Sequence, residues 1–421
     1  MNDARQSPMT WVAAVTIAVG GALLGGCGGC GIEQSPGQLM RGEADRQGLE
    51  RLEEEGRDRV RSGSQRLSFE LVEAVRDETE GDFAISPQAF LMGVGQLIPA
   101  VEGDTRQSIA EMWGVEEEEL EMVMAVLNQQ GVHLEGQSGS GLRLDHRNDV
   151  WVDSRLEPSQ AYLDLLMRYS GRGIHGVDGE TAIDDWIQRV MGDRSIELVG
   201  EWEEGSVALT QAVKVGGMWQ YAFEEEASGG GPMESADDAQ VRPMMEGRES
   251  YRFYRDAQTQ AVAFGYQGTN TSLIAMKPRS SSASFEEWEE GLDSARFLEV
   301  VDGLSRLEEG EVGLPTFEVS HRWDLRSALG EMAPEMTGDE VDLSGIGSPA
   351  PRRLGVVGHH AALEVGSRGG RQSAEHVEEA RSRGQGIRFD RPFYVVVYDQ
   401  GAEAVLLVGR VMEGLEAEHL E

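Results

Sequence analysis

Two strand-like apolar runs near the C-terminal end of the chain flank a long polar segment. The first run is His359–Val365 and the second is Phe389–Val397, whereas residues 366–388 are rich in Gly, Arg and Glu. The polar segment has no periodic pattern of apolar residues that could pack against a core, and we therefore expect it to be an exposed loop. A long loop without secondary structure of its own is uncommon inside a domain and is usually functional. The fold must therefore hold the two strands and leave the segment between them outside.

The chain is long and strongly acidic. Its 421 residues suffice for one large domain or two ordinary ones, with a sizeable core. The formal net charge of -38 argues against nucleic acid as a partner, because a phosphate backbone calls for a basic surface.

The N-terminus predicts export. Residues 9–26 are apolar and uncharged and follow Arg5, which is typical of a signal peptide. The stretch ends in Leu24-Gly25-Gly26-Cys27, which resembles the lipobox of bacterial lipoproteins. That resemblance implies that residues 1–26 are removed and that Cys27 carries a lipid, so that the only membrane contact is a lipid anchor. The alternatives are an ordinary secretory signal and an uncleaved anchor. We therefore expect an exported protein, either a cell-envelope lipoprotein or a secreted extracellular one.

Hydrophobic periodicity sets the remaining boundaries. Residues 27–64 are polar and rich in Glu and Arg, and we interpret them as a tether. Sustained periodicity predicts a folded domain over residues 65–415, and an acidic tail, residues 416–421, follows it.

Helical spacing dominates the first half of the domain and β-branched and aromatic runs dominate the second. We therefore predict an α+β fold with large mixed sheets and no βαβ repeat. The predicted helices are Leu67–Arg76, Ala89–Leu97, Thr105–Trp113 with Thr105 as its cap, Tyr162–Tyr169 and Ile183–Val190. The predicted strands are Phe83–Ile85, Asn148–Val152, Val207–Val215, Thr271–Met276, Gly313–Val319 and Tyr394–Tyr398.

Eight short motifs follow one another along the domain. They are Phe83-Ala84-Ile85-Ser86-Pro87, Gly103-Asp104-Thr105 with Ile109, Ala212-Val213-Lys214-Val215-Gly216-Gly217-Met218-Trp219 with Phe223, Val241-Arg242-Pro243-Met244-Met245, Leu314-Pro315-Thr316-Phe317 with Asp324-Leu325, Asp342-Leu343-Ser344-Gly345-Ile346, Arg391-Pro392-Phe393 and Val408-Gly409-Arg410-Val411. Each motif alone is a weak signal. In this order, across about residues 66–415, they resemble the serpin family of serine protease inhibitors.

The resemblance implies a fold of three β-sheets and about nine helices with an exposed reactive-centre loop. It also implies that the protein is attacked by a protease as a substrate and is not itself an enzyme. A protease cleaves the loop and forms an acyl-enzyme, and the freed loop inserts as a strand into the largest sheet. The alternative within the family is a non-inhibitory surface binding or structural protein whose loop is cleaved without trapping.

The family pattern places the loop hinge at six consecutive residues, in which Gly369 matches the family's glycine. They are Gly369, Gly370, Arg371, Gln372, Ser373 and Ala374. With a strand period of two, Gly370, Gln372 and Ala374 share one face, the smaller and less charged one, which would turn inward. Inhibitory members carry a run of Thr and Ala here, whereas this chain has Gln372, His376 and Glu378 on the inward face. Burying such groups unpaired costs about 1–3 kcal/mol each, which would slow insertion.

Two bonds are candidates for cleavage. Counting back from Phe389 gives Arg381–Ser382, which we prefer, and counting forward from the hinge gives Arg383–Gly384 as the alternative. Both place Arg before the bond, and both therefore predict a trypsin-like serine protease as the partner, with an acidic group in its specificity pocket.

Four residues match positions that the family uses to control sheet opening. Ser86, Gln211 and His359 match a hydrogen-bond cluster, with Gln211 at a position that is usually Asn, and Trp219 matches an aromatic at the end of the sheet where the loop enters. Without the resemblance, His359 is interpreted as a structural histidine and Trp219 as a core aromatic.

We expect no metal and no other cofactor. The two cysteines, Cys27 and Cys30, form a lone CxxC in the leader without a second ligand pair. His359 and His360 are adjacent on a predicted strand and would point to opposite faces. No catalytic triad, phosphate loop or paired-carboxylate constellation stands out, so we predict that the protein is not an enzyme. We also expect it to be a monomer.

Overall fold

The computed structural model describes most of the predicted domain. The described residues are 37–48, 51–137, 141–192, 194, 196–198, 200, 203–225, 244–338, 341–368 and 386–412. Several predicted features lie outside these ranges, namely the signal peptide with Cys27, the hinge Gly369–Ala374, both candidate bonds (Arg381–Ser382 and Arg383–Gly384) and the tail 416–421. In the described part of the chain, no helix is both long enough and apolar enough to cross a bilayer.

Within the described residues the chain forms nine α-helices and three β-sheets, which confirms the predicted α+β class. The helices are α1 (Glu54–Arg76), α2 (Pro87–Leu97), α3 (Gly103–Trp113), α4 (Leu120–Gln137), α5 (Gln160–Ser170), α6 (Glu180–Met191), α7 (Phe285–Glu290), α8 (Ser294–Gly303) and α9 (Arg326–Met332). Short 3₁₀ turns are η1 (Ile98–Ala100), η2 (Glu117–Glu119), η3 (Pro334–Met336) and η4 (Ser344–Ile346).

The first sheet, which we call the large sheet, has six strands in the order β1-β5-β3-β6-β14-β12. These strands are β1 (Gln38–Met40), β5 (Ile174–Val177), β3 (Leu142–Asp153), β6 (Ser206–Gly217), β14 (Arg353–Val365) and β12 (Phe317–Asp324). The central strands β6 and β14 run parallel, while β3 is antiparallel to β6 and β12 is antiparallel to β14. Nearly every residue of β6 and β14 is buried, which explains why both read as continuous apolar runs.

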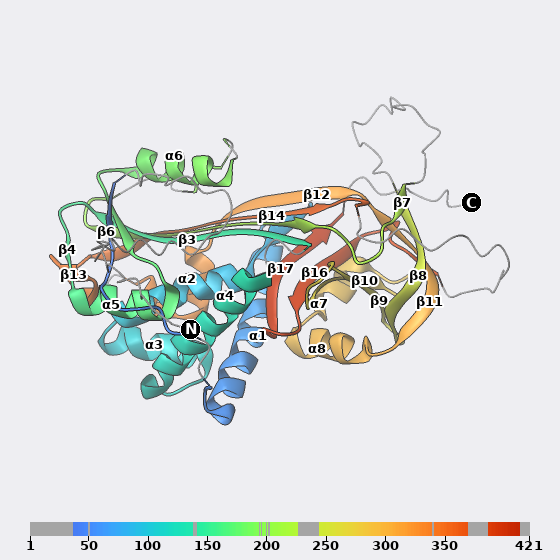
Figure 1. Ribbon diagram of the computed structural model, residues 1–421, viewed down its shortest axis with the longest axis horizontal. Coiled ribbons are helices and arrows are strands. Elements are labelled where there is room, and N and C mark those ends of the chain that lie inside the picture. The colour runs from blue at the N-terminus through green and yellow to red at the C-terminus, as the bar shows by residue number, and fades with distance from the viewer. Residues whose placement is uncertain are drawn as a thin grey trace, which may run out of the picture. The chain divides into compact units, whose positions relative to one another are not determined.

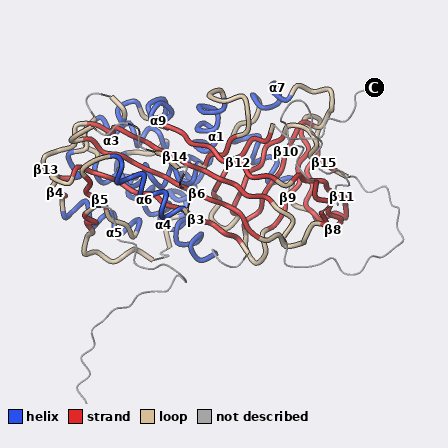
Figure 2. Tube along the Cα trace, turned by 90° about the horizontal axis from the view of Figure 1, so that it is seen from above, coloured by secondary structure: helices blue, strands red, loops and turns tan. Residues whose placement is uncertain are grey.

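Helices pack on both faces of the large sheet, and on the outer face they cover only part of it. On one face, helices such as α2 and α4 pack in a common apolar core with residues of β3, β6 and β14 (Figure 1). On the other face, α6 lies across β3 and β6 (Figure 2), and its Ile183 and Ile187 pack against Trp151 and Ala208.

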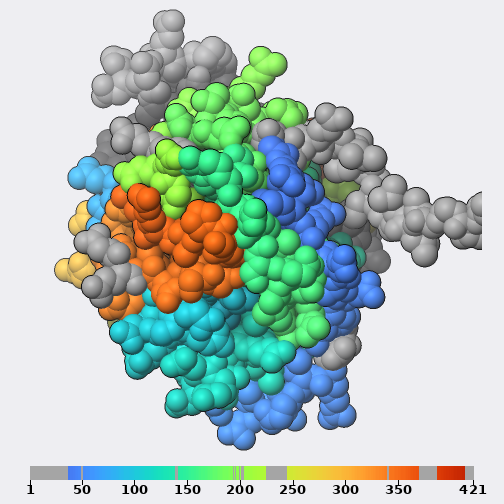
Figure 3. Space-filling model, turned by 90° about the vertical axis from the view of Figure 1, so that its left-hand side faces the viewer, coloured from blue at the N-terminus to red at the C-terminus, as the bar shows by residue number. Residues whose placement is uncertain are grey.

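The second sheet has nine strands. The order is β15-β11-β8-β9-β10-β16-β17-β2, and β7 pairs with β8 beside this path. Its strands are β2 (Phe83–Ile85), β7 (Glu224–Glu225), β8 (Met244–Arg255), β9 (Thr259–Gly265), β10 (Thr271–Pro278), β11 (Leu307–Pro315), β15 (Ile387–Arg388), β16 (Phe393–Asp399) and β17 (Ala404–Val411). A second apolar core joins this sheet to the C-terminal halves of β6 and β14. The third sheet pairs β13 (Gly347–Ser348) with β4 (Glu157–Pro158), and Figure 3 shows the face that carries it.

Most predicted elements differ from the observed ones by a few residues at their ends, and two of the differences have a clear structural cause. The helix α3 begins at Gly103 and not at a Thr105 cap, because the Thr105 hydroxyl instead accepts a hydrogen bond from the backbone N–H of Asp342 over 2.9 Å. The predicted strand Gly313–Val319 is two strands, since β11 ends at Pro315 in the second sheet and β12 begins at Phe317 in the large sheet.

Part of the segment that we interpreted as a tether is folded. β1 pairs antiparallel with β5, and Arg46 donates to Asn128 and Glu135 of α4. The helix α1 already begins at Glu54, where the carboxylate of Glu53 caps it by accepting from the backbone N–H of Gly56 over 2.7 Å. The many Glu and Arg residues on the exposed face of α1 obscured its few apolar positions in the sequence.

Candidate functional site

The β6–β14 pair lies at the centre of the site, and we call the boundary between these two strands the seam. Its parallel register runs from Ser206 opposite Arg353 to Val215 opposite Leu363. β14 ends at Val365 and leads directly into residues 366–368, so the loop leaves the large sheet at the end of the seam. A chain that turned back from Val365 into the seam would run antiparallel to both strands. Insertion would therefore replace one parallel ladder by two antiparallel ladders, which are slightly more stable per residue.

Three hydrogen bonds, which we call the hinge clamp, hold the start of the loop at this end. The indole Nε1–H of Trp219 donates to the carbonyl of Gly366 over 2.6 Å. The backbone N–H of Trp219 donates to Arg368 over 2.9 Å, and that of Phe223 donates to Ser367 over 3.2 Å. Trp219 is buried and stacks on Tyr266 with ring centroids 4.9 Å apart. Residues 366–368 are thus fixed to the segment that follows β6.

Further along the seam the structure brings Ser86, Gln211 and His359 together. His359 on β14 and Gln211 on β6 are register partners, so their contact crosses the seam directly. The backbone N–H of Ser86 donates to Nε2 of His359 over 3.0 Å, and Nδ1 of His359 lies 3.2 Å from Oε1 of Gln211. Ser86 also caps α2, since its hydroxyl accepts from the N–H of Ala89. Trp219 is not part of this group and belongs to the hinge clamp.

The surroundings of His359 keep its ring neutral. The side chain is fully buried, and burial, with a smaller contribution from neighbouring His360, lowers the pKa of His359 to about 3. Because Nε2 accepts from Ser86, the single ring proton belongs on Nδ1 and is donated to Gln211. Protonation of the second nitrogen would break the bond to Ser86 and place an unpaired charge inside the core.

The longer arm of Gln211 fits because a glycine faces it. A Cβ on Gly93 of α2 would lie 2.6 Å from Nε2 of Gln211. Among the described residues, that Nε2 has no hydrogen-bond partner, and neither do the side-chain amide atoms of Asn148 or Oε1 of Gln96. Asn148 is the register partner of Gln211 on β3, and Nε2 of Gln96 donates to its carbonyl. Sequence reasoning missed Gly93, Gln96 and Asn148, because only the fold brings them to the seam.

Two ion pairs cross the outer face of the seam. Arg143 on β3 reaches over β6 to Glu364 on β14, with 2.5 Å between the charged atoms. Lys214 on β6 reaches over β14 to Glu318 on β12, at 3.4 Å. All four side chains are partly exposed, so each pair contributes about 0–1 kcal/mol and is screened by salt. Both pairs must separate if a strand enters the seam.

The comparisons with known proteins agree with this geometry. A family model described as "Serpin (serine protease inhibitor)" matches residues 62–414. The chain belongs to the serpin family. Alpha-1-antitrypsin of Sus scrofa is 24% identical over 363 residues, which are 82% of this chain and 85% of the relative. The crystal structure of the thermophilic serpin tengpin in the native state matches with a TM-score of 0.71 and 15% identity, covering 89% of this chain and 99% of tengpin, and shows a shared fold.

The serpin fold implied by the sequence motifs is therefore confirmed. In this serpin the described residues contain no group of three or more His, Cys, Asp or Glu side chains that could hold a metal ion. The roles of Ser86, Gln211, His359 and Trp219 in sheet opening, and of the loop residues outside the described ranges, stay predictions.

Acid should weaken the seam through His359. The folded-state pKa of about 3 lies below the ordinary 6.5, so the unfolded chain takes up the proton first as the pH falls. The stabilisation by neutral His359 is fully present above pH 6.5 and is lost between 6.5 and 3. Denaturant unfolding at pH 7.5 and at pH 5 should show a loss of about 2 kcal/mol from this residue. His359→Gln should remove that part of the loss.

The control for this measurement is His133→Gln, which removes a half-buried histidine outside the seam. It should keep the acid-dependent loss of the wild type. An unchanged loss in His359→Gln would show that another group causes the pH dependence.

Proposed function

We propose that this serpin inhibits a trypsin-like serine protease as a suicide substrate. Membership of a family described as serine protease inhibitors, with relatives named alpha-1-antitrypsin, supports serine protease inhibition in general. The observation that carries the proposal is the seam, a parallel strand pair whose second strand leads directly into residues 366–368, the start of the segment that we expect to be exposed and to hold the candidate bonds.

The covalent step takes place at the preferred bond. Arg381 occupies the acidic specificity pocket of the protease, and the serine hydroxyl of the protease attacks the carbonyl of Arg381. An ester forms between that serine and Arg381, and the peptide bond to Ser382 breaks, so that Ser382 leaves as a free amine. The protease then remains attached to the freed end of the loop.

The freed segment is long enough to fill the seam. Residues 366–381 outnumber the 12 residues of β6, even after a turn at the end of β14. Insertion has to release the hinge clamp, separate the His359–Gln211 contact and break the two ion pairs that cross the seam. In return, the backbone N–H and C=O groups of the new strand gain ladder partners, some in β6 on one side and the others in β14 on the other side.

A non-inhibitory function is the second candidate, and the composition of the hinge favours it. Gln372, His376 and Glu378 would enter the sheet interior, where each unpaired polar group costs about 1–3 kcal/mol. If insertion is slower than hydrolysis of the ester, the protease escapes and the protein is a substrate. Such a chain would act as a surface binding or structural protein of the cell envelope.

Trypsin separates the two candidates. The inhibitor should form a covalent complex that survives boiling in detergent, and it should be visible on a denaturing gel as a band at the summed mass. Arg381→Gly should abolish the complex, whereas the matched change Arg383→Gly should leave it. Cleavage at residues 381–383 with no complex would contradict the inhibitory proposal and support the non-inhibitory one.

Loop cleavage should also change stability. Because an inserted strand satisfies a complete ladder of backbone groups, the nicked protein should melt higher than the intact protein by on the order of tens of degrees. Differential scanning calorimetry of protein nicked by trypsin measures the shift. Equal melting temperatures would mean that the loop stays outside the sheet.

We further propose that Cys27 anchors the protein through a lipid. The anchor would place the folded unit near a membrane of the cell envelope, with the residues that follow Cys27 as a spacer. Cys27→Ser should move the protein from the membrane fraction to the soluble fraction or leave it unprocessed, because no thiol remains for lipid transfer at that position. Cys30→Ser, the matched control, should change nothing. A soluble wild type that begins at another residue would contradict the anchor and leave the inhibitory proposal intact.

A further inference from the structure

A cavity lies where the second sheet forks. β8 pairs with β9 only as far as Arg252 opposite Ala263, and beyond this point β8 continues beside β11. The segment after β6 fills part of the fork: the N–H of Gln220 donates to the carbonyl of Gly265, and Trp219 forms a bridge with Tyr266. The remaining space between the diverging strands is a cavity of about 130 Å³.

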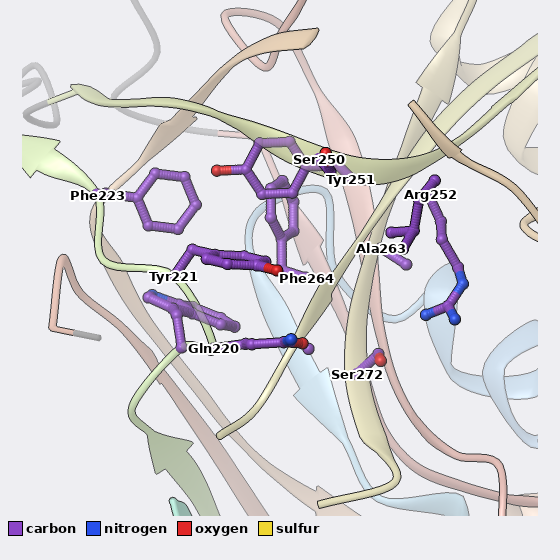
Figure 4. Close-up of a pocket in the computed structure, with 12 residues that line it drawn as sticks. Gln220, Tyr221, Phe223, Ser250, Tyr251, Arg252, Ala263, Phe264 and Ser272 are labelled. Carbon is purple, nitrogen blue, oxygen red and sulfur yellow. The ribbon is translucent and has the colours of Figure 1, made fainter. Parts of the chain in front are cut away.

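One wall of the cavity is aromatic. It is made by Trp219, Tyr221, Phe223, Tyr251 and Phe264, and Figure 4 shows Tyr221, Phe223 and Tyr251 gathered on one side. The rings of Phe223 and Tyr251 lie 5.6 and 5.5 Å from that of Phe264, which is an ordinary spacing for interacting aromatics. The planes of Phe223 and Tyr251 are tilted by 55° and 69° to that of Phe264, so the wall offers aromatic edges and faces to a ring of similar size.

The opposite side of the cavity is polar and carries a positive charge. Arg252, Ala263 and Ser272 lie across from the aromatic rings in Figure 4, and Gln220 and Ser250 complete the rim. Arg252 is exposed and has no ion-pair partner among the residues that the structure describes, although the chain carries a net charge of -38. A guanidinium without a carboxylate beside it suits an anionic ligand group.

A buried polar atom in the same wall also lacks a partner. The hydroxyl of Tyr251 is buried and forms no hydrogen bond within the described structure. Figure 4 shows it directed toward Phe223, which lines the same cavity. The hydroxyl packs over Gly247, so the cavity meets the ring of Tyr251 and not its hydroxyl.

We propose that this cavity binds a small monocyclic aromatic compound that carries a carboxylate. The volume suits one ring, since an engineered apolar cavity of about 150 Å³ holds benzene. The ring lies against the aromatic wall, and the carboxylate binds the guanidinium of Arg252.

Ligand binding reaches the hinge clamp through two shared residues. Trp219 and Phe223 line the cavity, and their backbone N–H groups hold the carbonyls of Arg368 and Ser367. A ring packed against both side chains restricts their motion, and these two amides then exchange with solvent more slowly. The inference goes beyond the proposed function and does not depend on loop cleavage.

Calorimetric titration of the intact protein with 4-hydroxyphenylacetate tests the proposal without any protease. We expect saturable one-to-one binding. Arg252→Gln should weaken it roughly tenfold, because a charge-assisted hydrogen bond is lost. Arg248→Gln is the matched control on the same strand, since Arg248 pairs with Glu311 and does not line the cavity. The neutral analogue 4-methylphenol should bind to wild type and to Arg252→Gln with equal and weaker affinity.

Absence of saturable binding to the wild type would overturn the proposal. Equal effects of Arg252→Gln and Arg248→Gln, or equal affinities for the acid and the neutral analogue, would overturn the role of Arg252. Hydrogen exchange of the amides of Trp219 and Phe223 provides the second readout, and an unchanged rate with ligand bound would overturn the link to the hinge clamp.

Discussion

The parallel pairing of β6 with β14 is the constraint on which the rest of this structure depends. Parallel strands need a crossover connection, and here residues 218–352 between them supply β8 to β11 of the second sheet and α7 to α9. The outer neighbours β3 and β12 are antiparallel to the pair, so the centre of the large sheet is where its pairing pattern changes. The chain leaves β14 beside this change of pattern, which places residues 366–368, the start of the predicted loop, where one more strand would fit.

Polar groups beneath the seam limit how stable the closed sheet can be. His359 is satisfied only as a neutral ring, and the amides of Gln211 and Asn148 leave buried atoms unpaired. Each such atom costs about 1–3 kcal/mol in a protein interior, or is met by an ordered water. We infer that these groups keep the closed state from becoming too stable, and that the hinge clamp and the ion pairs across the seam set the barrier to opening.

Much of the fold could be predicted from the sequence, because strong local signals lie in a fixed order. The helix predicted over Ala89–Leu97 is α2, which begins two residues earlier at Pro87, and the buried strands β6 and β16 were predicted from their β-branched residues. Local signals failed where a distant residue decides the structure. The hydroxyl of Thr105 accepts a hydrogen bond from the backbone N–H of Asp342, and Thr105 therefore does not cap its helix.

Residues of the candidate site could be predicted only where a family motif includes them. Ser86, Gln211 and His359 were placed in one group from the family pattern, and the structure brings them within hydrogen-bond distance. Arg143 and Glu364 lie 221 positions apart, and no spacing rule connects them. Gly93 on α2 leaves room for the longer side chain of Gln211 on β6. This contact between a helix and a strand cannot be predicted from a single sequence.

Opening of the seam to admit a strand is tested most directly by a distance measured across the seam. Spin labels at Arg143 on β3 and Glu318 on β12 lie on opposite sides of the seam, on exposed positions of the large sheet. After loop cleavage by trypsin, pulsed electron paramagnetic resonance should show the labels farther apart by about 5 Å, which is one strand spacing. An unchanged distance after complete cleavage would contradict insertion and show that the large sheet stays closed.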